Sequence, residues 1–386
     1  MKHIGMVLSG VLACLVGVRM ADAAGTLKPV ALSGEGVIVG AAFSPDSSRL
    51  AIMRNVATPG SSGQRHVLQI MELKSGQEIA HADVLGTEAA TLASNAHFIA
   101  YSPDARYLLL ATKGSDVLSI LDATSLQPMK QIALHPEADS RTSLGEGHRY
   151  FRGVISLGVP SKGGSFGALT HDELQGNEVF IGSFSAGQII KSWTLGQGRT
   201  ATQLGQTSLS LGEDGSKTAV SVLPGENSLP KGFNNLRLYD SRSGEMVKSI
   251  RTDGLVGQIM LLSGETILAS RIDTPGLFSK KTCIEKWSFG AGTLDSQFCD
   301  QGRTVSAALG ASLATGRVVG FASQLHKSIE GQVYAASGRI DAWDVKTGSL
   351  IASSAEIPKL VSSVQVSSNG QWIMADQMLM QLTTAP

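Results

Sequence analysis

The stretch YSPDARYLLLATKGSDVLSILDATSLQPMKQIAL, from Tyr101 to Leu134, decides the fold. Its apolar runs have the length of strands, and short turns rich in Pro, Asp, Gly and Ser separate them. Runs such as YLLLAT are apolar at nearly every position, which is typical of strands that are buried on both faces of a sheet. The stretch therefore predicts consecutive strands with short connections.

The same pattern recurs along the chain. FSPDSSRLAIMR at Phe43, LGEDGSKTAVSV at Leu211 and VSSNGQWIMA at Val366 all have the form of YSPDARYLLLAT. A second strand, turn and strand follows, as in LRLYDSRSGEMVKSI and IDAWDVKTGSLIAS. Each complete unit thus has four strands over about 40–50 residues, the period of a propeller blade. A pair of β-sandwiches is the alternative, but it does not predict a repeated period of four strands.

Seven such units can be placed on the chain. The seventh ends after three strands, whereas GTLKPVALSG, which begins at Gly25, has the form of a fourth strand. The sequence therefore predicts an all-β, seven-bladed β-propeller of four-stranded blades, its ring closed by the N-terminal strand completing the C-terminal blade. Closure would remove two exposed sheet edges with unpaired backbone groups. The units are 37–84, 96–134, 149–196, 206–252, 255–300, 303–356 and the remainder.

These units resemble the WD-repeat and YVTN-type β-propellers, and their SPD hairpins resemble those of the propeller in the Tol envelope system. Trp343-Asp344 is one true WD dipeptide, and Tyr239-Asp240 and Leu121-Asp122 are degenerate forms of it. The histidine-containing GH element of eukaryotic WD repeats is not evident. The resemblance covers nearly all of the chain after residue 23 and implies a propeller, without identifying a subfamily.

The first 23 residues have the features of a secretory signal peptide. Lys2 and His3 precede an apolar run, Ile4–Val18, and ADA at 21–23 offers small residues for cleavage. The run is short for a membrane span, which disfavours an uncleaved anchor. A lipoprotein signal ending at Cys14 is disfavoured because apolar residues continue beyond it. We therefore expect a signal peptide, 1–23, a single propeller domain, 24–386, and a periplasmic or secreted location.

The composition excludes some classes of partner. Charged residues make up 17% of the chain, and without residues 1–23 it carries 30 basic and 31 acidic residues. No basic excess points to nucleic acid or to anionic lipid. Because no second long apolar run follows, we expect no integral membrane span after signal removal.

Two cysteines, Cys283 and Cys299, remain beyond the signal, in CIEKWSFGAGTLDSQFC. If GAG is a hairpin turn centred on Ala291, both cysteines lie at the same distance from the turn and face each other across two antiparallel strands. Facing strand positions come close to the separation that a disulfide needs, and an oxidising compartment favours the bond. We predict a disulfide; two buried thiols are the alternative.

Long connections predict a binding face. The first and third turns of each unit are short, whereas the extra residues fall in the connections from second to third strand and between units. In a propeller these connections emerge on one face, and functional residues are often carried by loops on a rigid scaffold. Tolerated surface insertions without function are the alternative. The weak candidates for partner binding are Arg65, His135, His148, His171, Lys231, Phe233, Phe278, Lys280 and Lys281.

Chemical motifs are scarce. His135, His148 and His171, with nearby carboxylates, suit a divalent metal by residue type, but their spacing matches no metal motif. The chain has no G-x-S-x-G nucleophile elbow and no phosphate-binding G-K-[ST]. We therefore predict no catalytic, cofactor or metal residue. The expected function is a non-enzymatic scaffold that binds an envelope or extracellular protein, or a small ligand. The alternative is a propeller enzyme, such as a lactonase or a cofactor-dependent dehydrogenase subunit, with its site at the central channel mouth.

Overall fold

The computed structural model is entirely β-structure over the residues that it describes. The predicted signal peptide lies outside them, and none of them belongs to a helix able to span a membrane. The described residues are 25–58, 64–84, 97–135, 152–172, 176–195, 208–222, 232–252, 254–263, 265–271, 283–300, 303–327 and 333–384.

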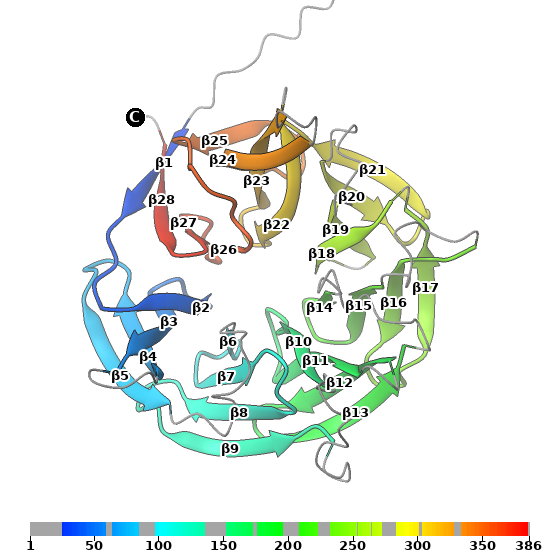
Figure 1. Ribbon diagram of the computed structural model, residues 1–386. Helices are drawn as coiled ribbons and strands as arrows, with labels where there is room; N and C mark the ends of the chain where they lie inside the picture. Colours follow the sequence, from blue (N-terminus) through cyan, green and yellow to red (C-terminus); the bar gives the residue numbers. More distant parts are fainter. Residues whose placement is uncertain are drawn as a thin grey trace, which may run out of the picture.

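Five of the sheets are four-stranded and antiparallel, and each uses four consecutive strands (Figure 1). The first two are β2 (Val37–Phe43), β3 (Arg49–Ala57), β4 (Gln64–Glu72) and β5 (Glu78–Val84), then β6 (His97–Tyr101), β7 (Tyr107–Thr112), β8 (Val117–Asp122) and β9 (Pro128–Ala133). The third is β10 (Arg152–Gly158), β11 (Ser165–Asp172), β12 (Gly176–Ser183) and β13 (Gln188–Thr194). The other two are β14 (Leu209–Leu211), β15 (Lys217–Ser221), β16 (Leu236–Asp240) and β17 (Met246–Ile250), then β18 (Val256–Leu261), β19 (Thr266–Arg271), β20 (Ile284–Ser288) and β21 (Thr293–Phe298).

The remaining eight strands form one sheet made of two antiparallel halves. One half is β22 (Thr304–Ser312), β23 (Arg317–Lys327), β24 (Val333–Asp344) and β25 (Leu350–Ser354). The other is β26 (Val364–Val366), β27 (Trp372–Ala375), β28 (Met378–Thr384) and the N-terminal strand β1 (Gly25–Val30). β1 pairs antiparallel with β28 along its whole length, and it joins the halves through a short parallel pairing with β25. The predictions of an all-β fold and of four-stranded antiparallel units are therefore confirmed.

The repeated turn motif has the same side-chain hydrogen bonds in three of its four occurrences; the fourth has Gly212 in place of the serine. The Oγ of Ser44 accepts the N–H of Arg49 at 2.9 Å and donates to Asp46 at 2.5 Å. The matching turns after β6 and β26 repeat both bonds at Ser102 and Ser367. These turns also share a left-handed residue after the Asp or Asn, which is Gly370 in the last of them. The SPD and SSN sequences thus encode one rigid turn.

The aspartates of the WD-like dipeptides have a structural role at the turn after each third strand. The Oδ1 of Asp344 accepts the backbone N–H groups of Lys346 and Thr347, at 3.0 and 2.7 Å. Asp122 and Asp240 cap their turns in the same way. These backbone hydrogen bonds lower the pKa of all three carboxyl groups. The dipeptide is therefore a turn signal here.

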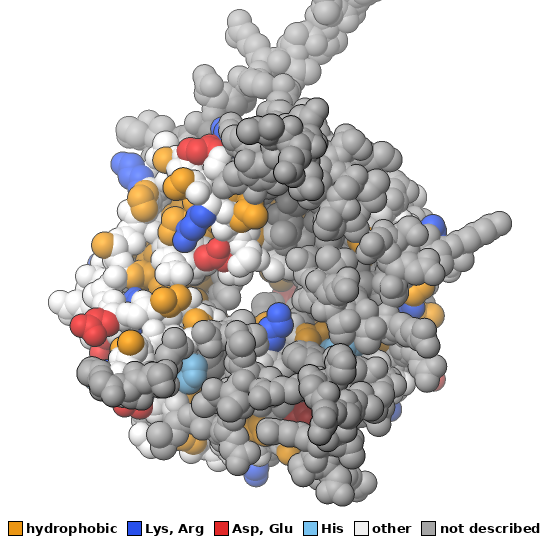
Figure 2. Space-filling model, in the orientation of Figure 1, with side chains coloured by type: hydrophobic (Ala, Val, Ile, Leu, Met, Phe, Trp, Pro, Cys, Tyr) orange, Lys and Arg blue, Asp and Glu red, His pale blue; other side chains and the backbone are white. Residues whose placement is uncertain are grey.

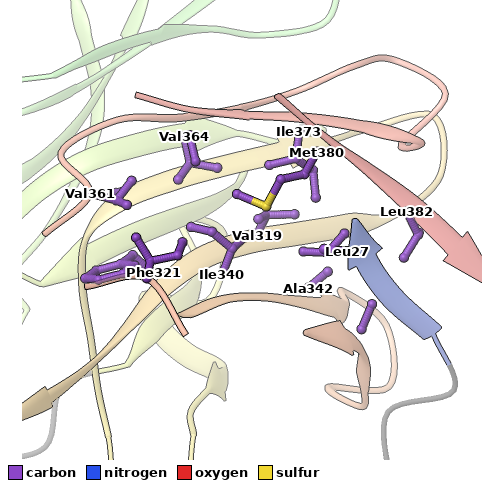
Figure 3. Packing of buried hydrophobic residues seen from close by; sticks show 14 residues of the cluster. Leu27, Val319, Phe321, Ile340, Ala342, Val361, Val364, Ile373, Met380 and Leu382 are labelled. Carbon is purple, nitrogen blue, oxygen red and sulfur yellow. The ribbon is translucent and has the colours of Figure 1, made fainter. Parts of the chain in front are cut away.

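The sheets pack against their sequence neighbours through separate hydrophobic clusters. Their first strands lie around a common centre, and each contacts the first strand of the next sheet. The same holds between the ends of the chain, because β26 contacts β2 and one cluster joins Leu50 and Ile52 to Trp372. The cluster around β1 buries Leu27 among Ile340, Met380 and Leu382 (Figure 3). The first and last described strands, β1 and β28, are thus part of the core.

Candidate binding face

The connections between strands differ strongly at the two ends of the sheets. At one end, first and second strands are joined by short turns such as 44–48, and third and fourth strands by turns such as 73–77. In six sheets a backbone bond ties the two turns together, as Leu73 N–H to Ser48 O does in the first. The other end carries the long connections, including 134–151, 195–208, 222–235 and 272–283. We call this end the long-connection face.

One of the candidate residues, His135, lies at the start of the long connection 134–151. His135 is half-buried, and its Nδ1 lies 3.2 Å from Asp116 while its Nε2 lies 3.3 Å from Glu178. The ring packs edge-on against Phe180, with centroids 5.1 Å apart. Asp116 precedes β8 and Glu178 lies in β12, so His135 bridges two neighbouring sheets. Sequence reasoning missed both carboxylates because neither is near His135 in the chain.

His171 does not join this cluster. It is buried at the end of β11, where its Nδ1 lies 2.9 Å from the Oδ1 of Asn177. His171 pairs with Asn177 across the two strands, and the preceding residue, Thr170, pairs with Glu178. Because successive side chains alternate between the faces of a sheet, His171 and Glu178 point to opposite faces. The structure thus separates two histidines that sequence proximity grouped together. Among the described residues, no three His, Cys, Asp or Glu side chains are arranged so that they could hold a metal ion.

The two other candidates that the structure describes, Arg65 and Phe233, lie in or next to different sheets. Arg65 is exposed in β4, where its guanidinium lies 3.4 Å from Asp83. Phe233 is half-buried, and the guanidinium of Arg237 lies over its ring at 5.5 Å. The others, His148, Lys231, Phe278, Lys280 and Lys281, lie outside the described residues.

A second charged cluster, which sequence reasoning missed, lies between β21 and β25. Arg303 binds Asp300 at 3.3 Å and Glu356 at 3.0 Å. Arg339 in β24 binds the same oxygen of Asp300 at 3.2 Å and also Asp341 at 2.8 Å. No sequence pattern predicts this cluster, because its members come from three separate segments of the chain that share no motif. The two arginines face three carboxylates. Two buried atoms of the cluster, the Nε of Arg339 and the Oδ2 of Asp341, have no hydrogen-bond partner among the described residues.

The predicted disulfide is present and lies beside this cluster. Cys283 and Cys299 flank the hairpin of β20 and β21, with Cα atoms 4.8 Å apart. The bond fastens the end of connection 272–283 to the residue before Asp300. A loop of this length corresponds to a stabilisation of about 3 kcal/mol in the chain-entropy model.

Asp341 gives the charged cluster a pH dependence. Its side chain is fully buried, and burial raises its pKa although Ser353 and Arg339 bind the carboxylate. The folded protein therefore holds this proton more tightly than the unfolded chain, and Asp341 costs stability as the pH rises above its unfolded value of about 4. Asp341→Asn keeps an oxygen for Ser353 and Arg339 but cannot ionise. We expect the unfolding free energy of the variant, relative to the parent, to increase from pH 4 to pH 7.

Urea unfolding of both proteins at several pH values measures this difference. Asp300→Asn is the control, because it also removes a carboxylate that contacts Arg339. Parallel pH curves for parent and Asp341→Asn would contradict the assignment.

The centre of the molecule carries little charge. Within the bounds of the seven first strands, charged residues and histidines occur only at the first positions of β6 and β10. Polar side chains here bind the next sheet instead: Ser156, Ser208 and Gln258 accept the N–H groups of Leu209, Ile259 and Leu309. Figure 2 shows a hollow at the centre with hydrophobic, acidic and basic side chains interspersed around it.

Comparison with known proteins adds no assignment. No protein-family model matches the chain, and no curated protein matches it.

Proposed function

We propose that the chain is a seven-bladed β-propeller of the WD-repeat and YVTN type, closed by β1 in the last blade. The contacts of successive first strands, including that of β26 with β2, support this arrangement. The pairing of β1 with β28 supplies a fourth strand to the last three. The shared turn bonds of the SPD and WD-like segments support the resemblance.

The function that we propose is non-enzymatic binding of a partner protein, or of a small ligand, through the long-connection face. One observation carries it: the turns at one end of the sheets are short and hydrogen-bonded to one another, whereas the long connections gather at the other end. Two large apolar side chains are also exposed at this end, Val37 at 51% and Leu360 at 54%. Exposed apolar groups beside polar ones are typical of protein-binding surfaces.

The disulfide supports a periplasmic or secreted location, since such bonds persist in oxidising compartments. The partner would then be an envelope or extracellular protein. The alternative, a propeller enzyme, requires titratable groups converging at the mouth of the central hollow. In the described residues the His135 cluster is built from a residue after the fourth strand β9, a residue before the third strand β8 and one in the third strand β12. The first strands are nearly uncharged, and this favours binding over catalysis.

Affinity capture from the extracytoplasmic fraction tests the proposal. The bait is the full chain, with Val37→Asp plus Leu360→Asp as the variant and Leu313→Asp as the control. Leu313 is 40% exposed in a short turn at the opposite end. We expect one set of partners with the parent and the control and at least about a tenfold loss with the variant, the effect of burying a charge at an apolar contact. Equal capture by all three baits would overturn the proposal.

A further inference from the structure

The outer strands share a β-bulge. In the first sheet Ile70 pairs with Ala80 and Met71 with Glu78, so Ile79 is an extra residue in β5. The other hairpins between third and fourth strands contain the same irregularity close to the turn. The extra residues in them are Met129, Ile190, Val247, Asp295 and Ile351.

Five of these six extra residues are apolar, and four of them are exposed. The exposed fractions are 49% for Ile79, 55% for Met129, 58% for Ile190 and 42% for Val247. A bulge in an edge strand discourages unwanted pairing with another sheet, which explains the extra residue. It does not explain the apolar side chain, because a polar residue would protect the edge equally well without exposing apolar surface. The repeated choice therefore indicates contact with a partner.

The chain shows what can cover such a site. Ile351, the extra residue in β25, is half-buried and packs against the cluster that contains Leu27 of β1. Directly after it, Ala352, Ser353 and Ser354 pair in parallel with Gly25, Thr26 and Leu27. An extended segment thus lies on the outer edge of β25 and covers its apolar bulge. In the described residues the outer edges of β9, β13 and β17 have no such strand.

Lysines mark these three consecutive edges. Lys130, Lys191 and Lys248 each follow the extra residue directly. The aliphatic part of Lys130 packs over Gly187 in a turn of the next sheet, so closely that an added Cβ there would lie 2.8 Å from its Cγ. Lys191 packs over Gly244 of the following sheet, where an added Cβ would lie 3.1 Å from its Cε. Lys248 binds Glu265 at 2.9 Å, whereas neither of the other two forms an ion pair with a described residue. An apolar side chain with an amine beside it suits an apolar and a carboxylate side chain of a partner.

We propose that the outer edges of β9, β13 and β17 each accept an extended segment of a partner protein by parallel strand addition, as β25 accepts β1. Backbone hydrogen bonds hold the segment, and an apolar residue of it covers the bulge. At β9 and β13 an acidic residue of the segment binds Lys130 or Lys191, whereas Lys248 of β17 keeps its ion pair with Glu265. The bulges lie beside the short turns, at the end of the sheets remote from the long connections. This surface is therefore distinct from the long-connection face, and it stands without the function proposed there.

The test uses acetylated peptides of sequence GTLKPVAL, which is residues 25–32, and GTLEPVAL, which carries a glutamate in place of the lysine. Binding to the full-length protein is followed by fluorescence anisotropy. We expect the acidic peptide to bind more tightly, and Met129→Ser plus Ile190→Ser plus Val247→Ser to weaken it about tenfold, as loss of apolar contact predicts. Leu313→Ser, at a site 40% exposed in the turn between β22 and β23, should leave binding unchanged.

Two further measurements separate strand addition from unspecific apolar contact. Bound peptide should slow hydrogen exchange at backbone amides of β9, β13 and β17, and N-methylation of the second and third residues of the peptide should abolish that protection. Absence of binding, binding that the triple variant leaves intact, or binding without protection of these strands would each overturn the proposal. Displacement of β1 from β28 by the peptide would appear as undiminished binding to the triple variant, and it counts against the proposal.

Discussion

Deletion of Gly25–Gly34 is expected to abolish the cooperative unfolding transition of the whole protein. Six residues of β1 pair with β28, and three of them pair with β25 as well. Without β1, the backbone edge of β28 is exposed and the halves of the eight-stranded sheet are no longer joined. The deletion should lower the free energy of unfolding more than the loss of any single side chain does. We expect a decrease of at least about 5 kcal/mol, which is comparable with the total stability of many domains.

A matched pair of point variants isolates the packing contribution of β1. Leu27 is 3% exposed and lies among Ile340, Met380 and Leu382 (Figure 3). The next residue, Lys28, is exposed. Leu27→Asp should lower the unfolding free energy by about 4 kcal/mol or more, because it buries a charge in an apolar cluster. Lys28→Asp makes the same side chain at the neighbouring position and should cost less than about 0.5 kcal/mol.

Urea unfolding followed by circular dichroism measures these losses. A peptide of residues 25–36 added to the truncated protein should restore part of the transition, since it supplies the missing strand in trans. A truncated protein that unfolds at the same urea concentration as the parent would show that β1 is dispensable, and it would refute closure of the last blade by this strand.

The parts of this fold that local patterns encode could be predicted from the sequence. The SPD turns, the hairpin around Ala291 and its disulfide depend on residues close together in the chain, and so does the apolar character of strands such as β7. The pairing of β1 with β28 was also predictable, because a three-stranded final unit leaves an edge that only a strand from elsewhere can cover.

The candidate sites depend on contacts between sheets, which local patterns do not specify. His135 and His171 look equivalent in sequence. Strand alternation nevertheless places His171 on the face of the β11–β12 pair opposite to Glu178, which is a partner of His135. The partners of His135 come from β12 and from the connection before β8. The bulges on the outer strands escaped prediction for a different reason: one extra residue in a hairpin changes the register, and the hydrophobic pattern at an exposed edge is too weak to show it.

Arg54→Met is expected to lower the unfolding free energy by about 3 kcal/mol, the scale of breaking a buried charged network. Arg54 lies in β3 with 4% of its surface exposed, and burial lowers its pKa while Glu78 opposes that effect. Its Nε donates to Gln69 at 2.6 Å and its Nη2 to the carbonyl of Ser33 at 2.8 Å. Gln69 in turn donates to Glu78 at 2.7 Å.

This network fastens the connection between β1 and β2, residues 31–36, to the first sheet. Arg54 also donates to the carbonyl of Gly36 at 3.4 Å, so one guanidinium holds two carbonyl groups of the connection. A methionine fills similar space but leaves those carbonyls and the Gln69 oxygen without their donor. Arg54→Lys retains the charge without the planar fork of donors, and we expect an intermediate loss.

Arg65→Met is the matched control, because it removes an arginine from the adjacent strand of the same sheet. Arg65 and Asp83 are each 55% exposed, and an exposed pair contributes about 0.5 kcal/mol or less. Urea unfolding compares the variants, and hydrogen exchange at residues 31–36 reports on the connection itself. If Arg54 fastens that connection, exchange there accelerates in Arg54→Met and not in Arg65→Met. Equal losses in the two variants, with unchanged exchange, would mean that the desolvation of the buried guanidinium offsets its hydrogen bonds. Strand pairing with β28 and β25 would then hold β1 without help from Arg54.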